Sequence, residues 1–253
     1  MIDVPAYNRE ADIKRLKFIM DTIRSFPDTA NLKVLDVGCG NGIISLNVGT
    51  LGVQVLALDV SEKAISIAQS KNKFKNVCFQ VLPAEGLSAI KEKFDVVICS
   101  EVLEHLTDPA GLLSELHGRL SENGILIVTV PNGFGPRELL VTRPMIFIRD
   151  HLSWFLGFVL SMKKVFGYSG TTVQSAADNL DHIQFFTKGA LRRMAKTNNY
   201  NITGFRHSNF IDDVFPFSLI ARKSQMIQKI DSKIADILPS IFVGGFFSIW
   251  KNK

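Results

Sequence analysis

The chain is poor in cysteine and has no uninterrupted apolar run of membrane-spanning length. Its 253 residues include three cysteines, Cys39, Cys78 and Cys99. That odd, small number does not make a disulfide framework. The first residues, Met1-Ile-Asp-Val-Pro, do not read as a secretory signal peptide. We therefore expect a reducing, cytoplasmic setting.

The sequence also lacks internal repeats and low-complexity linkers. Its 46% hydrophobic and 21% charged residues are close to the globular average, which excludes collagen, coiled coils and full disorder. This length suits one large domain or a domain with an insertion. We expect a single domain over residues 1–253, with an inserted substrate cap at about 134–180.

Charge is divided unevenly between the two halves. Residues 1–136 carry a net charge of −3, whereas residues 137–253 carry +8. The basic half predicts an anionic partner: a membrane surface, a phosphorylated lipid, an acidic metabolite or a nucleic acid.

Short apolar runs alternate with helical patterns along most of the chain. A doubly wound, mostly parallel sheet covered on both faces is predicted, with ligands at the carboxyl ends of its strands. The predicted strands are Lys33–Val37, Val53–Leu58, Val77–Leu82, Phe94–Cys99, Gly124–Val130, Tyr200–Arg206 and Ile241–Trp250. The predicted helices are Arg9–Phe26 and residues 42–51, 61–73, 85–92, 108–120, 187–198 and 218–238.

A glycine-rich loop follows the first predicted strand, in Val34-Leu-Asp-Val-Gly-Cys-Gly-Asn-Gly42. Gly38, Gly40 and Gly42 allow a tight turn and close approach of a ligand to the backbone. Asp36 precedes them, and its carboxylate suits a cationic group, such as an amino-acid ammonium, better than a pyrophosphate. Such loops also occur without ligands, so this pattern alone leaves both interpretations open.

A second carboxylate ends the second predicted strand. Asp59, in Leu56-Ala-Leu-Asp59, is placed to accept hydrogen bonds from both ribose hydroxyls of a nucleoside. The alternative is a capping role at the helix that begins near Ser61.

Together, Val34–Gly42 and Asp59 resemble the first two motifs of class I S-adenosylmethionine-dependent methyltransferases, closely over residues 30–135. The resemblance implies a seven-stranded Rossmann-like sheet with an apolar helical insertion after strand 5. Pro83 departs from the family pattern, where many members have Asp. The residues that the resemblance assigns to the cofactor are Asp36, Gly38, Cys39, Gly40, Gly42, Asp59, Val60, Ala84, Glu85 and Ser100.

The run Phe94–Pro109 places acidic and imidazole groups directly after the fourth predicted strand. If the chain turns helical after Ser100, then Glu101, Glu104 and His105 share one helix face. His105 can then take a proton from an acceptor hydroxyl, or the three groups can hold a divalent cation. A third interpretation is that they only brace the turn.

This run resembles that of ubiquinone-biosynthesis O-methyltransferases and, more distantly, of small-RNA 2′-O-methyltransferases. In these enzymes, Glu, Glu and His on the turn bind a metal, and the RNA enzymes add a later His. The resemblance implies the metal set Glu101, Glu104, His105 and His182, with Mg or Zn bound.

The apolar segment Leu152–Met162 is bounded by Arg149-Asp150-His151 and Lys163-Lys164. These charges interrupt it before the ~20 residues that a bilayer span needs. Three interpretations stay open: a lid over the site, a surface element in peripheral contact with a membrane through residues 145–166, or a packing helix.

We therefore expect a methyltransferase that uses S-adenosylmethionine and releases S-adenosylhomocysteine. Its expected acceptor is a hydroxyl on a small lipophilic or anionic molecule, such as a quinone, lipid or glycan precursor. A nucleic-acid methyltransferase and a non-catalytic cofactor-binding relative are the alternatives. A nicotinamide dehydrogenase is disfavoured because Ile43 stands where its third glycine would be.

Overall fold

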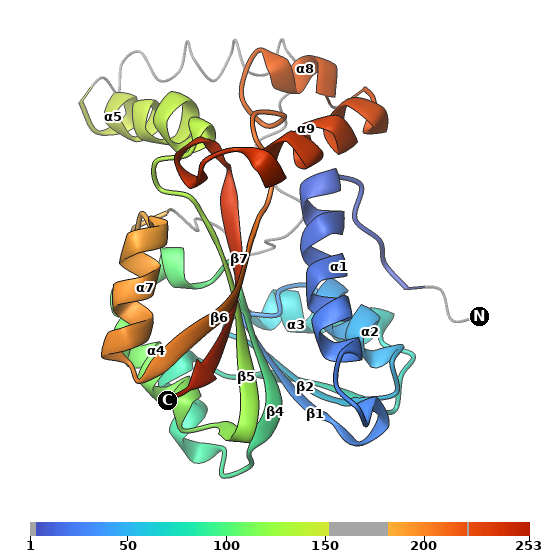
Figure 1. Cartoon of the computed structure of the whole chain (residues 1–253). Helices are drawn as coiled ribbons and strands as arrows, with labels where there is room; N and C mark the ends of the chain where they lie inside the picture. The colour runs from blue at the N-terminus through green and yellow to red at the C-terminus, as the bar shows by residue number, and fades with distance from the viewer. Residues whose placement is uncertain (1–3, 152–181, 222) are drawn as a thin grey trace.

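One seven-stranded sheet runs through the protein (Figure 1). The structure is a computed structural model that describes residues 4–151, 182–221 and 223–253. The strand order is β3-β2-β1-β4-β5-β7-β6. Neighbouring strands are parallel except where β7 pairs with β5 and β6, which confirms the predicted fold. The strands are β1 (Lys33–Val37), β2 (Gln54–Asp59), β3 (Val77–Val81), β4 (Phe94–Ser100), β5 (Leu120–Pro131), β6 (Tyr200–His207) and β7 (Gly245–Asn252).

Helices cover both faces of the sheet because successive strand residues point to opposite sides. Buried Val34 packs in the cluster that includes Ile19 and Ile44, from α1 and α2. Its neighbour Leu35 packs in a second cluster with Leu113 and Leu191, from α4 and α7. These helices are α1 (Glu10–Arg24), α2 (Ile43–Gly49), α3 (Glu62–Lys71), α4 (Pro109–His117) and α7 (Lys188–Thr197).

Side-chain caps fix where three of these helices begin. Ser61, Asp108 and Thr187 each accept a hydrogen bond from a backbone N–H in the first turn of α3, α4 and α7. The 3₁₀ turns that complete this part of the molecule are η1 (Thr29–Asn31), η2 (Ala84–Ala89) and η3 (Leu103–His105).

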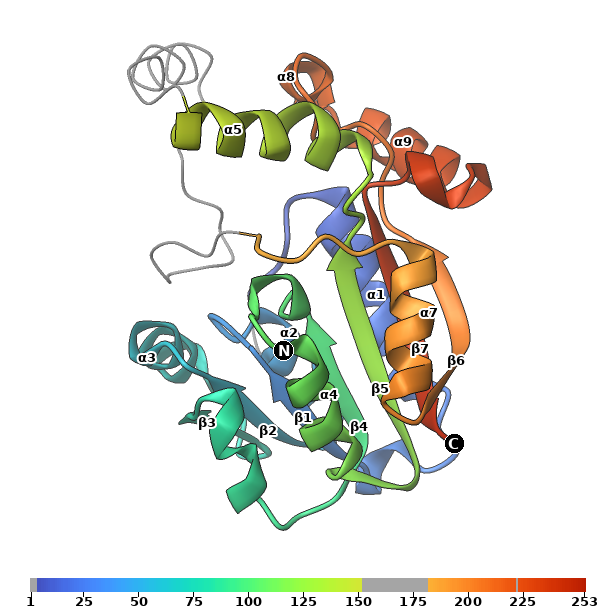
Figure 2. The same ribbon diagram turned by 90° about the vertical axis from the view of Figure 1, so that its left-hand side faces the viewer.

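Further helices lie beyond the carboxyl ends of β4 and β5 (Figure 2). The π-helical turn η4 (Glu138–Thr142) leads into α5 (Arg143–His151). Between β6 and β7 lie α8 (Phe217–Ala221), α9 (Gln225–Ile237) and the 3₁₀ turn η5 (Ser240–Phe242). We call α8, α9 and η5 the outer helices.

Three predicted elements were wrong in detail. The helix predicted over 218–238 is two helices, because the hydroxyl of Ser224 accepts from the N–H of Ile227 and starts α9 anew. The last strand begins at Gly245 rather than Ile241, since Pro239 is followed by the turn η5. The segment predicted as a helix at 85–92 is the 3₁₀ turn η2.

The apolar stretch Leu152–Met162, predicted within the insertion after β5, lies outside the described residues. Within the part of the chain that the structure covers, no helix has the length and apolar character needed to cross a bilayer.

Candidate functional site

The glycine loop leaves β1 in a conformation that side chains disfavour. Gly38, Gly40 and Gly42 have φ values of 73°, 53° and 79°, in the left-handed region. A Cβ on Gly42 would also lie 2.8 Å from the ring of Phe79 and 2.9 Å from Cβ of Ala68. The loop therefore needs glycine at this position both for its backbone angle and for space.

Asp59 joins the tip of β2 to the glycine loop. Its Oδ2 accepts a hydrogen bond from the N–H of Gly40 at 2.7 Å, and its Oδ1 accepts from the N–H of Ser61 at 2.9 Å. A carboxylate has about four lone-pair sites, so this one keeps acceptor capacity for hydroxyl groups. The neighbouring Val60 is 68% exposed and offers an apolar surface beside it.

Asp36 lies beneath the loop rather than on its surface. Its side chain is buried, and Ser45 Oγ donates to its Oδ2 at 2.6 Å. Burial, reinforced by the charge of Asp59, raises the pKa of Asp36 to about 7, although the bond from Ser45 opposes the shift. Its Oδ1 has no hydrogen-bond partner among the described residues. Cys39 is also buried here, and burial raises the pKa of its thiol.

The remaining predicted cofactor residues lie at the same edge of the sheet. Ala84 and Glu85 open η2, but their side chains are outside the described part of the structure. Ser100 ends β4 and is buried, with its Oγ 2.9 Å from Oγ1 of Thr129 on β5.

The turn after β4 differs from the predicted helical face. Glu101 has a left-handed φ of 56°, and only Leu103–His105 forms a short 3₁₀ turn. The carboxylate of Glu101 accepts a hydrogen bond from Oγ1 of Thr129 at 2.9 Å and lies 3.6 Å from Nη1 of Arg15. Glu101 thereby ties the turn to α1.

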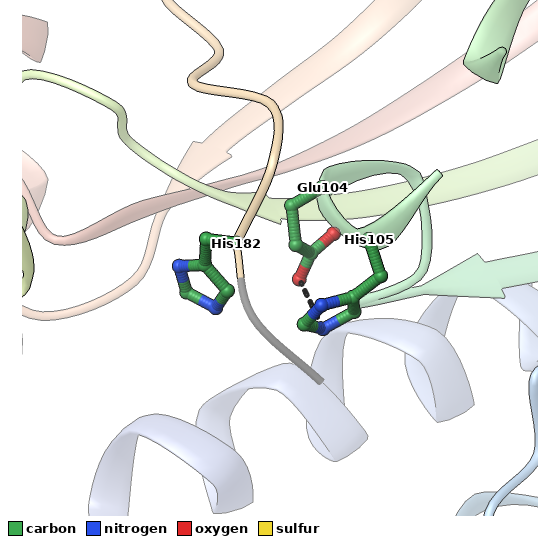
Figure 3. A group of neighbouring side chains, drawn as sticks. All are labelled: Glu104, His105 and His182. Carbon is green, nitrogen blue, oxygen red and sulfur yellow. Dashed lines mark ion pairs between the residues drawn. The ribbon is translucent and has the colours of Figure 1, made fainter. Parts of the chain in front are cut away.

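Glu104, His105 and His182 come together at this turn (Figure 3). One ligand atom from each lies within 4.8 Å of the others. Nε2 of His105 is 3.8 Å from Oε1 of Glu104. The structure therefore unites three of the four residues in the predicted metal set, and Glu101 is not part of this cluster.

Main-chain bonds place His182 beside the turn. The N–H groups of Ile183 and Gln184 both donate to the carbonyl oxygen of Glu104, at 2.8 and 3.0 Å. The chain then continues to Phe186, which bridges to Asn132 at the end of β5. His182 is thus held next to Glu104, which lies 78 positions earlier in the sequence.

Glu138, which the sequence analysis missed, lies behind His182. Its side chain is 1% exposed, and its Oε1 is 3.3 Å from Nδ1 of His182. Burial raises the pKa of Glu138, but the neighbouring His182 and Arg137 outweigh burial and hold that pKa below its usual value. Its position in an otherwise apolar segment, Glu138-Leu-Leu-Val, was the one available hint.

The cluster has the electrostatic character of a cation site. Both carboxylate oxygens of Glu104 are buried and, within the described residues, without a hydrogen-bond partner. Burial and the nearby charges of Glu101 and Glu138 raise the pKa of Glu104 well above its usual value. A bound cation would offset this cost, because it replaces the missing hydrogen bonds and neutralises the charge.

The sheet order and the loop at its carboxyl edge define the Rossmann-like fold of class I methyltransferases. A family model described as "Methyltransferase domain" matches residues 8–204, so the chain belongs to this methyltransferase family.

Three similar proteins illustrate the relationship. The ubiquinone biosynthesis O-methyltransferase of Glaesserella parasuis is 32% identical over 116 residues, covering 43% of this chain and 49% of that protein. A SAM-dependent methyltransferase structure from Archaeoglobus fulgidus has a TM-score of 0.60 at 15% identity, covering 96% of this chain and 94% of its own. Magnesium protoporphyrin IX methyltransferase from Synechocystis, solved with bound SAH, has a TM-score of 0.55 at 16% identity, covering 96% and 84%.

The chain spans about half the length of the curated relatives it matches.

Proposed function

We propose that the protein is an S-adenosylmethionine-dependent methyltransferase that O-methylates a hydroxyl of a small lipophilic or anionic acceptor. The observation that carries this proposal is the arrangement at one sheet edge. There the glycine loop bonded to Asp59 lies at the ends of β1 and β2, and the Glu104–His105–His182 cluster follows β4.

The glycine loop and its neighbours suit S-adenosylmethionine. Asp36, Gly38, Cys39, Gly40 and Gly42 would face the methionine part, and Asp59 the ribose. The adenine would lie against exposed Val60 and the residues Ala84 and Glu85, with Ser100 at the rim. The SAH bound by the Synechocystis methyltransferase supports the same cofactor class.

We infer the chemical class of the acceptor from the names of the curated relatives and from the net charge of the second half of the chain. Their names specify ubiquinone biosynthesis and O-methylation, which favours a phenolic hydroxyl on a lipophilic ring. The net charge of +8 on residues 137–253 would favour acceptors that also carry an anionic group.

The protein's task in this reaction is mainly to position the reactants. The cofactor's sulfonium already activates the methyl group, so the acceptor oxygen needs to approach within roughly 3–3.5 Å, in line with the leaving sulfur. His105 would take the proton from the acceptor hydroxyl. Glu104 would orient the imidazole, since its Oε1 lies 3.8 Å from Nε2 of His105.

The same cluster fits a divalent metal. Glu104, His105 and His182 would hold Mg or Zn, because the buried carboxylate of Glu104 has no hydrogen-bond partner among the described residues and the two half-buried imidazoles beside it are suitable ligands. When bound, the ion would lower the pKa of the acceptor hydroxyl. Glu138 would hold the ring of His182 from its other side, as carboxylates do for metal-binding histidines.

The remaining predictions complete this proposal. The chain would act as one domain over residues 1–253, with residues 134–180 forming the acceptor cap. The enzyme would work in the cytoplasm, with peripheral membrane contact through residues 145–166, of which 152–166 lie outside the described residues.

The experiment that tests this function is mass spectrometry of ligands that co-purify with the protein, followed by methyl transfer from labelled S-adenosylmethionine to catechol acceptors with and without prenyl tails. We expect bound S-adenosylhomocysteine and label in the acceptor. An Asp59→Ala variant serves as the negative control. Absence of cofactor binding in calorimetry would contradict the proposal.

A further inference from the structure

Helix α9 buries its polar side. Gln228, Asp231 and Ser232 are all buried. Oε1 of Gln228 accepts from the N–H of Glu10 at 2.9 Å, and the carboxylate of Asp231 accepts from the N–H groups of Phe210 and Ile211 at 2.7 and 2.9 Å. Hydrogen bonds rather than apolar packing therefore fasten much of this helix to α1 and to the chain after β6.

The opposite side of α9 is apolar and exposed. Met226, Ile230, Ile234 and Ile237 recur at helical spacing, with Met226 69% and Ile237 83% exposed. A surface helix of a globular protein normally turns its apolar stripe inward. This reversed orientation leaves an apolar stripe with nothing in the described structure packed over it.

The neighbouring outer helices carry further exposed apolar side chains, which together with the stripe we call the patch. Phe217 and Ile220 of α8 and Ile241 and Phe242 of η5 are each at least half exposed. Large exposed apolar side chains gathered on neighbouring elements usually mark an interaction site. The patch lies on the part of the molecule beyond the carboxyl ends of the parallel strands, which is also the end that carries the candidate site (Figures 1 and 2).

The exposed charges within α8 and α9, and between them, are almost all positive. Lys223, Lys229 and Lys233 are exposed. Of the two acidic residues in the described part of 217–237, Asp231 is buried and Asp236 lies 2.8 Å from Nζ of Lys14. An apolar face rimmed by lysine matches an anionic lipid surface. A second copy of the chain is disfavoured as the occupant, because a symmetric contact would bring the same lysines together.

We propose that the outer helices are a membrane-docking surface, in which the Met226–Ile237 stripe enters the headgroup region of an anionic bilayer. This inference is independent of the catalytic proposal, since it requires neither cofactor nor acceptor. It also differs from contact through residues 145–166, because it assigns binding to a different part of the chain. Docking here would turn the candidate site toward lipophilic molecules dissolved in the bilayer.

The test is sedimentation of the protein with vesicles of phosphatidylcholine, with or without about a third phosphatidylglycerol. We expect binding to the anionic vesicles that weakens with salt. The double variant Ile230→Ser/Ile237→Ser should lower the partition coefficient more than tenfold. Its matched control is Val81→Ser, an exposed apolar residue of the edge strand β3.

Charge is tested separately with Lys229→Gln/Lys233→Gln, since each lysine near an anionic surface contributes about 1 kcal/mol. We expect at least a tenfold loss on anionic vesicles, and no loss for the control Lys73→Gln/Lys75→Gln in the loop between α3 and β3. Thermal unfolding verifies that all variants fold. The proposal is overturned if the wild type does not bind anionic vesicles, or if Ile230→Ser/Ile237→Ser binds them as well as Val81→Ser does. It is also overturned if Ile230→Ser/Ile237→Ser leaves vesicle binding unchanged and instead abolishes self-association of the protein.

Discussion

Two neighbouring parts of the proposed site at the carboxyl end of the sheet are built in opposite ways: the glycine loop with Asp59, which we call the cofactor edge, and the Glu104–His105–His182 cluster, which we call the acceptor edge. At the cofactor edge, Gly40 and Asp59 lie 19 residues apart and are joined by a backbone N–H. At the acceptor edge, the cluster joins the consecutive residues Glu104 and His105 to the distant His182, with Glu138 behind His182. One edge is specified by a local motif and the other by long-range packing, so changes at the two edges should have separable effects.

The largest effect is expected from Gly42→Ala, compared with Gly52→Ala. Both residues have a left-handed φ, but a Cβ at Gly52 meets nothing within 4 Å, whereas at Gly42 it meets Phe79 and Ala68. We expect Gly52→Ala to lower the free energy of unfolding by about 1 kcal/mol and Gly42→Ala by about 3 kcal/mol. Urea denaturation measures both, and equal losses would show that space in the loop is not limiting.

Asp59→Ala tests the cofactor edge without changing the glycines. It removes a charged acceptor of the Gly40 and Ser61 N–H groups. The affinity for S-adenosylhomocysteine should fall by about 2 kcal/mol, roughly thirtyfold, in calorimetry. Glu62→Ala, a neighbouring acidic residue at the start of α3, should bind as the wild type does. Unchanged binding by Asp59→Ala would remove this residue from the site.

Glu138→Gln addresses the acceptor edge alone. Glu138 lies 3.3 Å from Nδ1 of His182, so we expect a loss of roughly twentyfold in Zn affinity, as is usual when the carboxylate behind a metal-binding histidine is lost. Metal competition and the absorption spectrum of the Co-substituted protein report this loss without an activity assay. Glu101→Gln is the matched control, because Glu101 is bonded to Thr129 and Arg15 instead. A larger loss for Glu101→Gln would restore the original four-residue set.

The smallest expected effect is the pH dependence of cofactor binding. The pKa of Asp36 is about 7, so this carboxyl becomes protonated below neutral pH and no longer attracts a cation. Affinity for S-adenosylhomocysteine should fall about tenfold from pH 8 to pH 6, and Asp36→Asn should flatten the profile.

The folding stability of the protein without cofactor should depend on pH in the opposite direction. The raised pKa favours the folded state at acidic pH, and that contribution is lost as pH rises from about 4 through 7.

The local geometry of the cofactor edge could be predicted from the sequence better than that of the acceptor edge, for a physical reason. Each parallel strand and each loop is formed by a short, continuous stretch of sequence. The apolar periodicity therefore identifies the strands directly, and Gly38–Gly42 identifies the loop. The hydrogen bonds from Ile183 and Gln184 to Glu104 join main-chain groups. Because any residue has these groups, no side-chain pattern in the sequence predicts this contact. His182 was predicted only by resemblance, and Glu138 was not predicted at all.

The outer helices show the same limit in another form. The sequence predicts one charged, periodic helix over 218–238 but not which side of it faces the protein. That choice depends on Gln228 and Asp231 finding partners at Glu10, Phe210 and Ile211. Hydrogen bonds to partners 20, 21 and 218 residues away in the sequence cannot be read from local periodicity.

The chain leaves the sheet at Asn132 and returns to it at Phe186, where the N–H of Gly133 donates to the carbonyl of Phe186 at 2.7 Å. The described residues between these two points, 133–151 and 182–185, are also held at Glu104, whose carbonyl oxygen accepts from the N–H groups of Ile183 and Gln184. Lengthening a chain segment between two anchored points adds little entropic cost, which grows only with the logarithm of its length. The length and sequence between these two anchored points can therefore change while the strands and the glycine loop stay untouched.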